Sequence, residues 1–277
     1  MVSSAPQPQP QPQPPAAGDP PSDPAPRLSF VIPAHEEERQ LPATLRAIET
    51  AAASLAFPYE VVVADDASSD RTAEVAREHG ARVISIDRRQ IAAARNAGAV
   101  AAEGEWLIFV DADTQVTADA VTAAVRALEA GVVGGGATFH FDGPIPLWSR
   151  VFLPIFLFLV RRLRVAPGCY VFARRDAFEK IGGFDESAFA GEELVLSRAL
   201  ARQGRFVIVR AHVITSARKL RTHSMLEVFW PVVKLSLFGR RARADRSKLD
   251  LWYGERREDP YEESAESGPT STDGKRD

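Results

Sequence analysis

Hydrophobic and polar positions along this chain follow two alternating patterns. Short apolar runs, rich in β-branched or aromatic residues, occupy positions 28–33, 60–64, 82–86 and 106–110. Between them lie alanine-rich segments with helical spacing, at 39–55, 70–78 and 90–102, and further helices are expected at 118–130 and 192–203. This order predicts an α/β fold with a mainly parallel central sheet flanked by helices on both faces.

Acidic residues follow three of the apolar runs. Ligands of such sheets bind beyond the carboxyl ends of the strands, so the polar groups in 33–37, 65–70 and 111–113 are candidates for a functional site. The run WLIFVDAD at 106–113 is the most informative, because a buried strand there ends in Asp111 and Asp113. Their carboxylates are suitable ligands for Mg²⁺ or Mn²⁺ bound against phosphate oxygens. An Asp-rich turn is the structural alternative, but three clustered acidic strand ends favour a compensating cation or ligand.

Composition separates one folded domain from two tails. Residues 1–26 are rich in Pro and Gln and residues 254–277 are polar and acidic, so both are expected to be disordered, which leaves a domain at 27–253. The tails together carry six net negative charges, so the chain's −3 becomes +3 for the domain. This weak positive charge suits an anionic small ligand or an anionic membrane surface and does not indicate nucleic acid binding.

Cys169 is the only cysteine in the 277 residues. Neither an intrachain disulfide nor a cysteine-based zinc site can therefore form, which favours a cytoplasmic location, and no signal-like segment opens the chain. No histidine neighbours Cys169 in the sequence, so we expect it to pack or to line a pocket.

Five motifs occur in an order that resembles the family 2 glycosyltransferases. They are VIPAHEEE (31–38), VVVADDASSDRT (61–72), AAARNAGAVAAEGEWLIFVDADT (92–114), GGFDE (182–186) and GEELVLSRAL (191–200). The resemblance covers residues 28 to about 220. It implies a GT-A fold, a nucleotide-diphosphate sugar of the UDP or GDP type as donor, a divalent cation as cofactor, and inversion at the anomeric carbon.

The resemblance also implies roles for individual residues. Those expected at the nucleotide are Pro33, Ala34, His35, Glu37, Asp65, Asp66, Arg95 and Asp111. Arg95 would reach the nucleotide or stabilise its pocket, with a structural ion pair as the alternative. Asp111 and Asp113 are the expected metal ligands, with Gln115 and His223 or His212 as further ones. Gln115 could instead cap the helix that follows it.

The resemblance places the catalytic base in the motif GEEL. Its second acid, Glu193, stands where the family usually has Asp, and Glu192 is the alternative base. Both acids could instead complement the positive end of the helix at 192–203. At the donor, Gly168 would let the backbone approach the sugar, Cys169 would line the pocket, and the loop containing Arg218, Lys219 and Arg221 would close over the diphosphate, unless that charged run is simply a solvated face.

Two apolar segments concern the acceptor, which the sequence leaves open as a glycan, a lipid or a small molecule. Segments 146–163 and 225–238 are each followed by arginines, and neither apolar run is long enough to span a membrane. Each could lie in the interface of an anionic membrane, at its inner face, or pack over the sheet edge.

Two other functions stay open, a nucleotidyltransferase and a non-catalytic nucleotide-sugar binding protein. The turn after the first strand lacks the Gly-rich, Lys- or Arg-bearing phosphate loop expected of the former. The oligomeric state cannot be read from the sequence.

Overall fold

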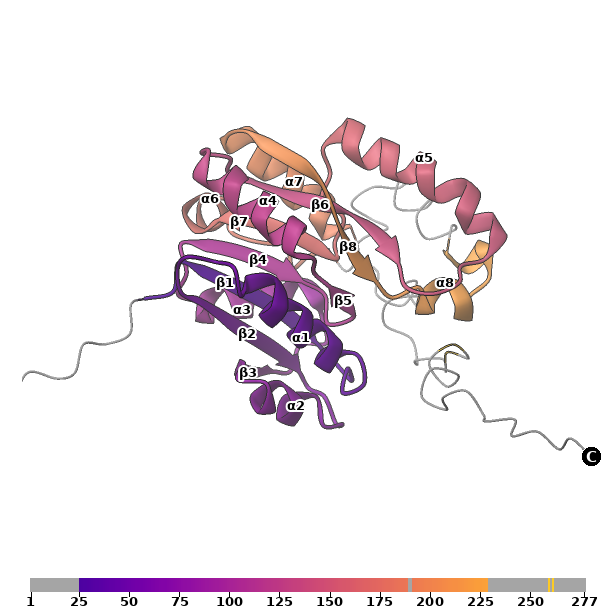
Figure 1. The fold of residues 1–277 in the computed structure, drawn as a ribbon, viewed down its shortest axis with the longest axis horizontal. Helices are drawn as coiled ribbons and strands as arrows, with labels where there is room; N and C mark the ends of the chain where they lie inside the picture. The colour runs from indigo at the N-terminus through magenta and orange to yellow at the C-terminus, as the bar shows by residue number, and fades with distance from the viewer. Residues whose placement is uncertain (1–24, 189–190, 229–258, 260, 262–277) are drawn as a thin grey trace, which may run out of the picture.

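The computed structural model describes residues 25–188 and 191–228, together with Asp259 and Tyr261. Its strands form one sheet in the order β3-β2-β1-β4-β7-β6-β8-β5 (Figure 1). The strands are β1 (Leu28–Ala34), β2 (Tyr59–Asp66), β3 (Arg82–Ile86), β4 (Trp106–Val110), β5 (Thr114–Gln115), β6 (Gly134–Phe141), β7 (Tyr170–Arg174) and β8 (Phe206–Thr215). The helices are α1 (Leu41–Ala52), α2 (Thr72–Glu78), α3 (Ile91–Ala101), α4 (Ala118–Glu129), α5 (Leu147–Leu163), α6 (Arg175–Lys180), α7 (Glu192–Gln203) and α8 (Arg218–Thr222).

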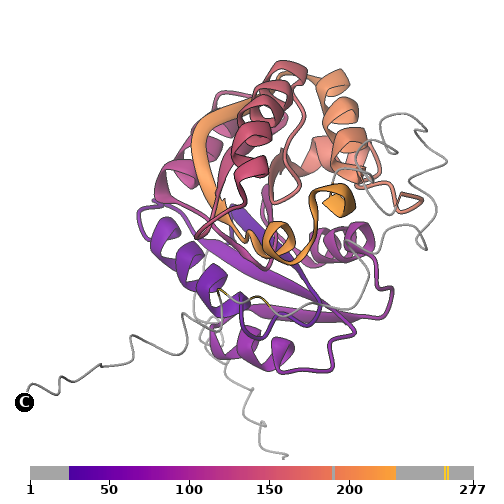
Figure 2. The same ribbon diagram turned by 90° about the vertical axis from the view of Figure 1, so that its right-hand side faces the viewer.

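Helices cover both faces of the sheet (Figures 1 and 2). Helices α1, α2 and α4 pack on one face, against a cluster that contains Phe30 and Ile108. Helices α3, α6 and α7 pack on the other, against a cluster that contains Val31 and Phe109. Neighbouring residues of a strand therefore face different helices, as expected for central strands that are apolar on both sides.

The direction of the strands places one edge of the sheet at the candidate site. β1 pairs in parallel with β2 and β4, β2 with β3, and β6 with β8. β7 runs antiparallel between β4 and β6. The carboxyl ends of β1, β2, β4, β6 and β8 consequently lie at the same edge.

These elements confirm the predicted α/β fold with its mainly parallel sheet. All four predicted strands are present, and the five predicted helices agree with α1, α2, α3, α4 and α7 to within three residues at each end. Nearly all of the predicted tails 1–26 and 254–277, and most of the apolar segment 225–238, lie outside the described residues. In the part of the chain that is described, no helix combines the length and hydrophobicity needed to cross a membrane.

Candidate active site

The loops that follow β1 and β2 are joined by hydrogen bonds. His35 Nδ1 lies 2.7 Å from the carbonyl oxygen of Asp66, and the backbone N–H of Glu37 donates to Thr72 Oγ1 at 2.8 Å. Between them Glu36 takes a left-handed conformation with φ of 55°. The two loops, which carry predicted nucleotide residues, are therefore joined side by side.

Asp65 and Asp66 end β2 beside Pro33 and Ala34, the buried end of β1. The Asp66 carboxylate accepts three hydrogen bonds of 2.7–2.8 Å from the backbone N–H groups of residues 88–90, and so holds the turn that leads into α3. Asp65 is different, because its buried Oδ1 has no hydrogen-bond partner among the described residues. A buried acceptor without a partner requires an explanation, and a ligand that donates a hydrogen bond to it is one.

Arg95 on α3 connects the end of β4 to the start of α7. Its side chain is only 1% exposed. Nη1 donates to Glu192 Oε1 at 2.8 Å, while Nη2 donates to Asp111 Oδ1 at 2.7 Å and to the Gly168 carbonyl oxygen at 2.9 Å. One guanidinium group therefore joins two of the motifs, 92–114 and 191–200, and the backbone at Gly168.

The charges in this cluster perturb one another. Burial alone would lower the pKa of Arg95, but the carboxylates of Asp111, Glu192 and Glu193 raise it above its ordinary value, so the guanidinium stays charged. Burial, reinforced by the neighbouring Glu192 carboxylate, raises the pKa of Glu193 to about 8. Glu192 is thus held in an ion pair, whereas Glu193 is a carboxyl group that takes up a proton near neutral pH.

Gly168 lies against the Glu193 carboxyl group, and the carbonyl oxygen of Cys169 accepts a hydrogen bond of 3.2 Å from the Asp111 backbone N–H. A Cβ atom built on Gly168 would stand 3.4 Å from Glu193 Oε1, so the glycine keeps the backbone close to that carboxyl group. Burial, with the carboxylates of Asp111 and Asp113, raises the pKa of the Cys169 thiol well above its ordinary value. A thiol held neutral fits packing or pocket lining rather than nucleophilic attack.

Asp113 faces a cation supplied by α8. Arg218 Nη2 lies 4.0 Å from Asp113 Oδ2 and 3.5 Å from Glu37 Oε1. All three side chains are at most 20% exposed. Arg218 therefore joins the loop after β1 to the end of β4, at the same edge of the sheet as the Arg95 cluster.

The fold and the acids at this edge of the sheet, here called the acid-rich edge, agree with a match to a known protein family. The model of Glycosyl transferase family 2 matches residues 29–182, which is more than half of the chain. The chain belongs to the family 2 glycosyltransferases. The match confirms the resemblance drawn from the five motifs.

Two curated relatives show what this family 2 chain is similar to. It is 38% identical over 106 residues to the succinoglycan biosynthesis protein ExoO of Rhizobium meliloti, covering 36% of this chain and 30% of that protein. It is 32% identical over 121 residues to the undecaprenyl-phosphate 4-deoxy-4-formamido-L-arabinose transferase of Serratia proteamaculans, covering 40% of this chain and 37% of that protein. The chain thus matches only about a third of the length of either relative.

A solved structure supports the fold of the family 2 chain. The mannosyltransferase PcManGT of Pyrobaculum calidifontis, in complex with GDP-Man and Mn²⁺, superimposes with a TM-score of 0.60 at 20% sequence identity. The match covers 79% of this chain and 64% of that protein. Together with the family match, this likeness confirms the predicted GT-A fold.

Within this family 2 domain, Arg221 and Lys219 lie apart from Asp113. Arg221 forms ion pairs with Asp142 at 3.0 Å and with the buried Asp259 at 2.6 Å, and its guanidinium lies 4.8 Å from the centre of the Tyr261 ring. Lys219 is exposed on the same helix, α8. Of the three predicted diphosphate contacts, the structure thus brings only Arg218 to the acid-rich edge.

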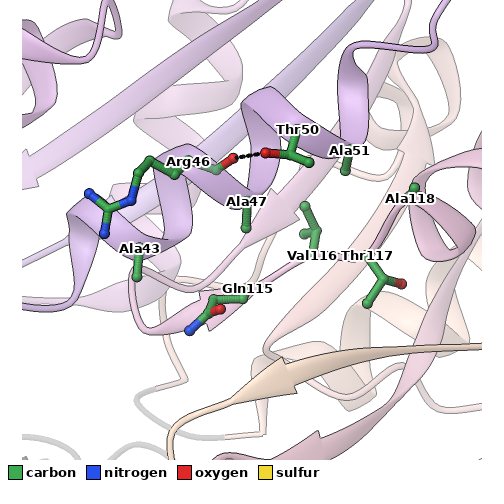
Figure 3. Close-up of a pocket in the computed structure, with 9 residues that line it drawn as sticks. All are labelled: Ala43, Arg46, Ala47, Thr50, Ala51, Gln115, Val116, Thr117 and Ala118. Carbon is green, nitrogen blue, oxygen red and sulfur yellow. Dashed lines mark hydrogen bonds between the residues drawn. The ribbon is translucent and has the colours of Figure 1, made fainter. Parts of the chain in front are cut away.

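The predicted metal ligands are also spread over more than one place. Gln115 lines a hollow of about 400 Å³ between α1 and the segment 115–118, in the company of Arg46 and Thr50 (Figure 3). His223 Nδ1 lies 2.9 Å from Thr222 Oγ1. In the part of the chain that the structure covers, no three His, Cys, Asp or Glu side chains are grouped as a metal site.

The sequence motif GGFDE has a structural role that spacing did not indicate. Asn96 Nδ2 donates to the Phe184 carbonyl oxygen at 3.0 Å and to Glu186 Oε1 at 2.9 Å. Gln90 Nε2 donates to the Glu186 carbonyl oxygen. This motif is therefore fastened to α3, next to Arg95. The asparagine directly after Arg95 in the motif ARN was the available signal.

Proposed function

We propose that this chain is a metal-dependent inverting glycosyltransferase that moves a sugar from a nucleotide-diphosphate donor to a hydroxyl or polyprenyl phosphate acceptor. The observation that carries the proposal is the Arg95 cluster, in which Asp111, Gly168 and Glu192 meet beside the protonatable Glu193. The GDP-Man and Mn²⁺ in the similar mannosyltransferase and the undecaprenyl phosphate named for the Serratia relative support the ligand classes.

The nucleotide base is assigned to the wall formed by the loops after β1 and β2. Asp65 Oδ1 is the acceptor we assign to a base N–H, because it is buried without a partner among the described residues. Asp66 supports this wall indirectly, since its carboxylate is already occupied by three backbone N–H groups.

A divalent cation fits the carboxylate of Asp113. Mg²⁺ and Mn²⁺ sites commonly use one or two protein carboxylates and complete their coordination with substrate phosphate oxygens, and such a site needs no cluster of three protein ligands. When bound, the cation supplies positive charge that neutralises the departing diphosphate. Arg218 adds a second positive charge 4.0 Å from Asp113, so it is the residue of α8 that we assign to the diphosphate.

Glu193 is the proposed catalytic base. A carboxyl group with a pKa of about 8 is a stronger base than an ordinary glutamate and is partly ionised near neutral pH. From a hydroxyl acceptor it would take the proton while the acceptor oxygen attacks the anomeric carbon opposite the diphosphate, which inverts the configuration; an ionised phosphate oxygen would attack in the same way without giving up a proton. Glu192 is a positioning residue, because its ion pair with Arg95 fixes the start of α7.

The substitution Glu193→Gln tests the role of the base. We expect the rate of sugar transfer to fall by about 10²- to 10⁴-fold, while the Kd of the nucleoside diphosphate with Mn²⁺ changes less than about threefold. Glu193→Asp should retain part of the activity, because it keeps the carboxylate. Glu49→Gln on the exposed side of α1 is the matched control and should behave as wild type.

Donor screening with UDP- and GDP-sugars, followed by NMR of the product, tests the reaction class. Opposite anomeric configuration in donor and product is the expected result. If Glu193→Gln transferred sugar at the wild-type rate, Glu193 would not be the catalytic base. A product with the same anomeric configuration as the donor would overturn the single-displacement mechanism.

A further inference from the structure

Helix α5 exposes apolar surface to a degree that other parts of the described chain do not. Of its 17 residues only Ser149 and Val160 are buried. Eight of the twelve large hydrophobic side chains that are exposed among the described residues belong to α5. They are Leu147, Val151, Phe152, Ile155, Phe156, Phe158, Leu159 and Leu163.

Several exposed residues of α5 lie away from the side on which it packs, although Phe156 also contacts Phe139 of the core, with ring centres 6.3 Å apart. Leu153 and Leu157 pack inward against the core cluster. Because α-helical residues repeat every 3.6 positions, Val151, Ile155 and Phe158 project to the other side. Figure 1 shows α5 at the periphery of the molecule, remote from β1, β2 and β3. The outer surface is therefore a continuous apolar stripe, larger than scattered exposed side chains would make.

The charge on and around α5 is of one sign. Residues 143–164 contain Arg150, Arg161, Arg162 and Arg164 and no Asp or Glu. All four arginines are exposed. Long arginine side chains can place their aliphatic stems on an apolar surface while the guanidinium binds anions. An apolar helix surface whose only charged residues within 143–164 are cations matches the boundary between acyl chains and anionic headgroups.

The same charges argue against a second copy of the chain as the occupant. In a twofold interface the same patch meets itself, so the arginines of α5 would meet arginines with no acid between them. Spanning a bilayer is also ruled out for α5. Its 17 residues reach roughly 25 Å at 1.5 Å per residue, which is less than the ~30 Å hydrocarbon core.

We propose that α5 docks the protein on an anionic lipid bilayer, with its apolar stripe in the interface and with its three arginines and the adjoining Arg164 on the lipid phosphates. Beneath the helix lies a hollow of about 650 Å³, which Arg161 and Arg162 line together with Phe139 and His140 of β6. This hollow gives a headgroup a cationic and partly apolar recess.

Docking through α5 would bring the membrane close to the proposed transferase site. Only residues 164–167 separate the end of the helix at Leu163 from Gly168, whose carbonyl oxygen accepts a hydrogen bond from Arg95. Resting on the proposed function, this places a lipid-linked acceptor at the membrane surface within reach of Glu193. Membrane binding itself needs no catalysis and can be tested alone.

Flotation of the full chain with lipid vesicles tests the proposal. Wild type should float with vesicles of phosphatidylcholine and phosphatidylglycerol at least tenfold better than with phosphatidylcholine alone. Ile155→Ser with Phe158→Ser should lower binding by about tenfold or more. Arg161→Gln with Arg162→Gln should lower it similarly, since each arginine contributes roughly fivefold.

Matched controls exist on other surfaces. Val100 is 86% exposed, and Arg77 and Arg126 are exposed, so Val100→Ser and the double variant Arg77→Gln with Arg126→Gln should float as wild type. Equal binding to both vesicle types would overturn the proposal, and so would wild-type binding by the α5 variants. Self-association of the wild type that the α5 variants abolish would point to a second copy and would also overturn it.

A separate readout distinguishes this proposal from the transferase assignment. Glu193→Gln should float like wild type although it has lost transfer. The α5 variants should keep the wild-type Kd for UDP or GDP with Mn²⁺. If the wild type did not bind UDP or GDP with Mn²⁺, the transferase site would be refuted, and the flotation result would be unaffected.

Discussion

The amino-terminal and carboxyl-terminal parts of the domain stabilise buried carboxylates with different kinds of hydrogen-bond donor. In the amino-terminal part, residues 28–110, Asp66 is neutralised by three backbone N–H groups from a neighbouring turn. In the carboxyl-terminal part, residues 111–228, acids are paired with side-chain cations, and the pairs of Glu192 with Arg95 and of Glu37 with Arg218 cross between the two parts. Backbone donors are fixed once the fold has formed, whereas side-chain pairs can be exchanged for ligand contacts.

This contrast suggests a division of work between the two parts. The amino-terminal part builds a fixed wall for the nucleotide from short loops joined by hydrogen bonds. The carboxyl-terminal part contains the exposed helix α5, the base Glu193 and the cation Arg218, all of which we assign to the acceptor and the departing diphosphate. We therefore expect substitutions in the loops after β1 and β2 to act on the nucleotide wall. Substitutions at Arg95, Glu193 and Arg218 should act through charge.

Replacing Arg95 should break the link between the two parts and have the largest effect on stability. Arg95→Met leaves the buried Glu192 and the partly buried Asp111 without their shared cation. We expect a loss of about 3–5 kcal/mol in the free energy of unfolding, measured by urea denaturation.

An exposed arginine provides the matched control for this prediction. Arg71 forms ion pairs with Glu74 and Glu78 on the surface, so Arg71→Met should leave the unfolding midpoint unchanged within error. Equal effects of the two substitutions would show that the Arg95 cluster does not hold the domain together.

Replacement by Asn should lower the stability of the protein at Asp66 and weaken nucleotide binding at Asp65. Asp66→Asn replaces an acceptor of three backbone N–H groups, so we expect a loss of about 2–3 kcal/mol in the free energy of unfolding. Asp65→Asn should leave stability nearly unchanged but weaken binding of UDP or GDP by about tenfold or more. Thermal unfolding with and without nucleotide separates the two effects, and a stability loss at Asp65 as large as that at Asp66 would contradict the assignment.

Glu193 should have a smaller and pH-dependent effect. Its folded-state pKa of about 8 lies above its ordinary value of 4.5, so the native state binds more protons between these values and loses stability as the pH rises. Glu193→Gln removes this penalty. We expect it to be more stable than wild type by about 1–2 kcal/mol at pH 9, after allowing for partial exposure.

The pH series contains its own check. Near pH 4 the carboxyl group is protonated in both states, so the two proteins should unfold at nearly the same temperature. A stability difference that does not change between pH 4 and pH 9 would rule out the raised pKa as its cause. Transfer activity of the wild type should rise with pH up to about 8.

Much of the fold could be predicted because its signals are local. The strands from β1 to β4 are short apolar runs that end in polar turns, and each helix between them has its own periodicity. Strands β5 to β8 were not among the predicted runs, and the direction of β7 could not have been inferred either, because a run that is buried on both faces reads the same in either direction. Helix α5 was recognised as apolar, but the sequence could not say which of its sides would be left uncovered.

The sequence predicted which residues belong to the candidate site, but it did not predict which of them contact one another. Asp65 and Asp66 are adjacent, and only the turn at residues 88–90 decides which of them stays available. Arg95 and Glu192 are 97 positions apart, so no spacing rule connects them. Asp259 falls in a segment expected to be disordered, yet it pairs with Arg221, which also pairs with Asp142.

The central claim is that Asp113 brings a cation to the diphosphate of a donor beside Glu193. Calorimetric titration of UDP and GDP with and without Mn²⁺, in wild type and in Asp113→Asn, tests it most directly. Mn²⁺ should tighten the Kd of one nucleotide by at least about tenfold in wild type and in the exposed control Asp119→Asn, and should have no effect in Asp113→Asn. A Kd in the wild type that is the same with and without Mn²⁺, or an unaltered response to Mn²⁺ in Asp113→Asn, would contradict the claim.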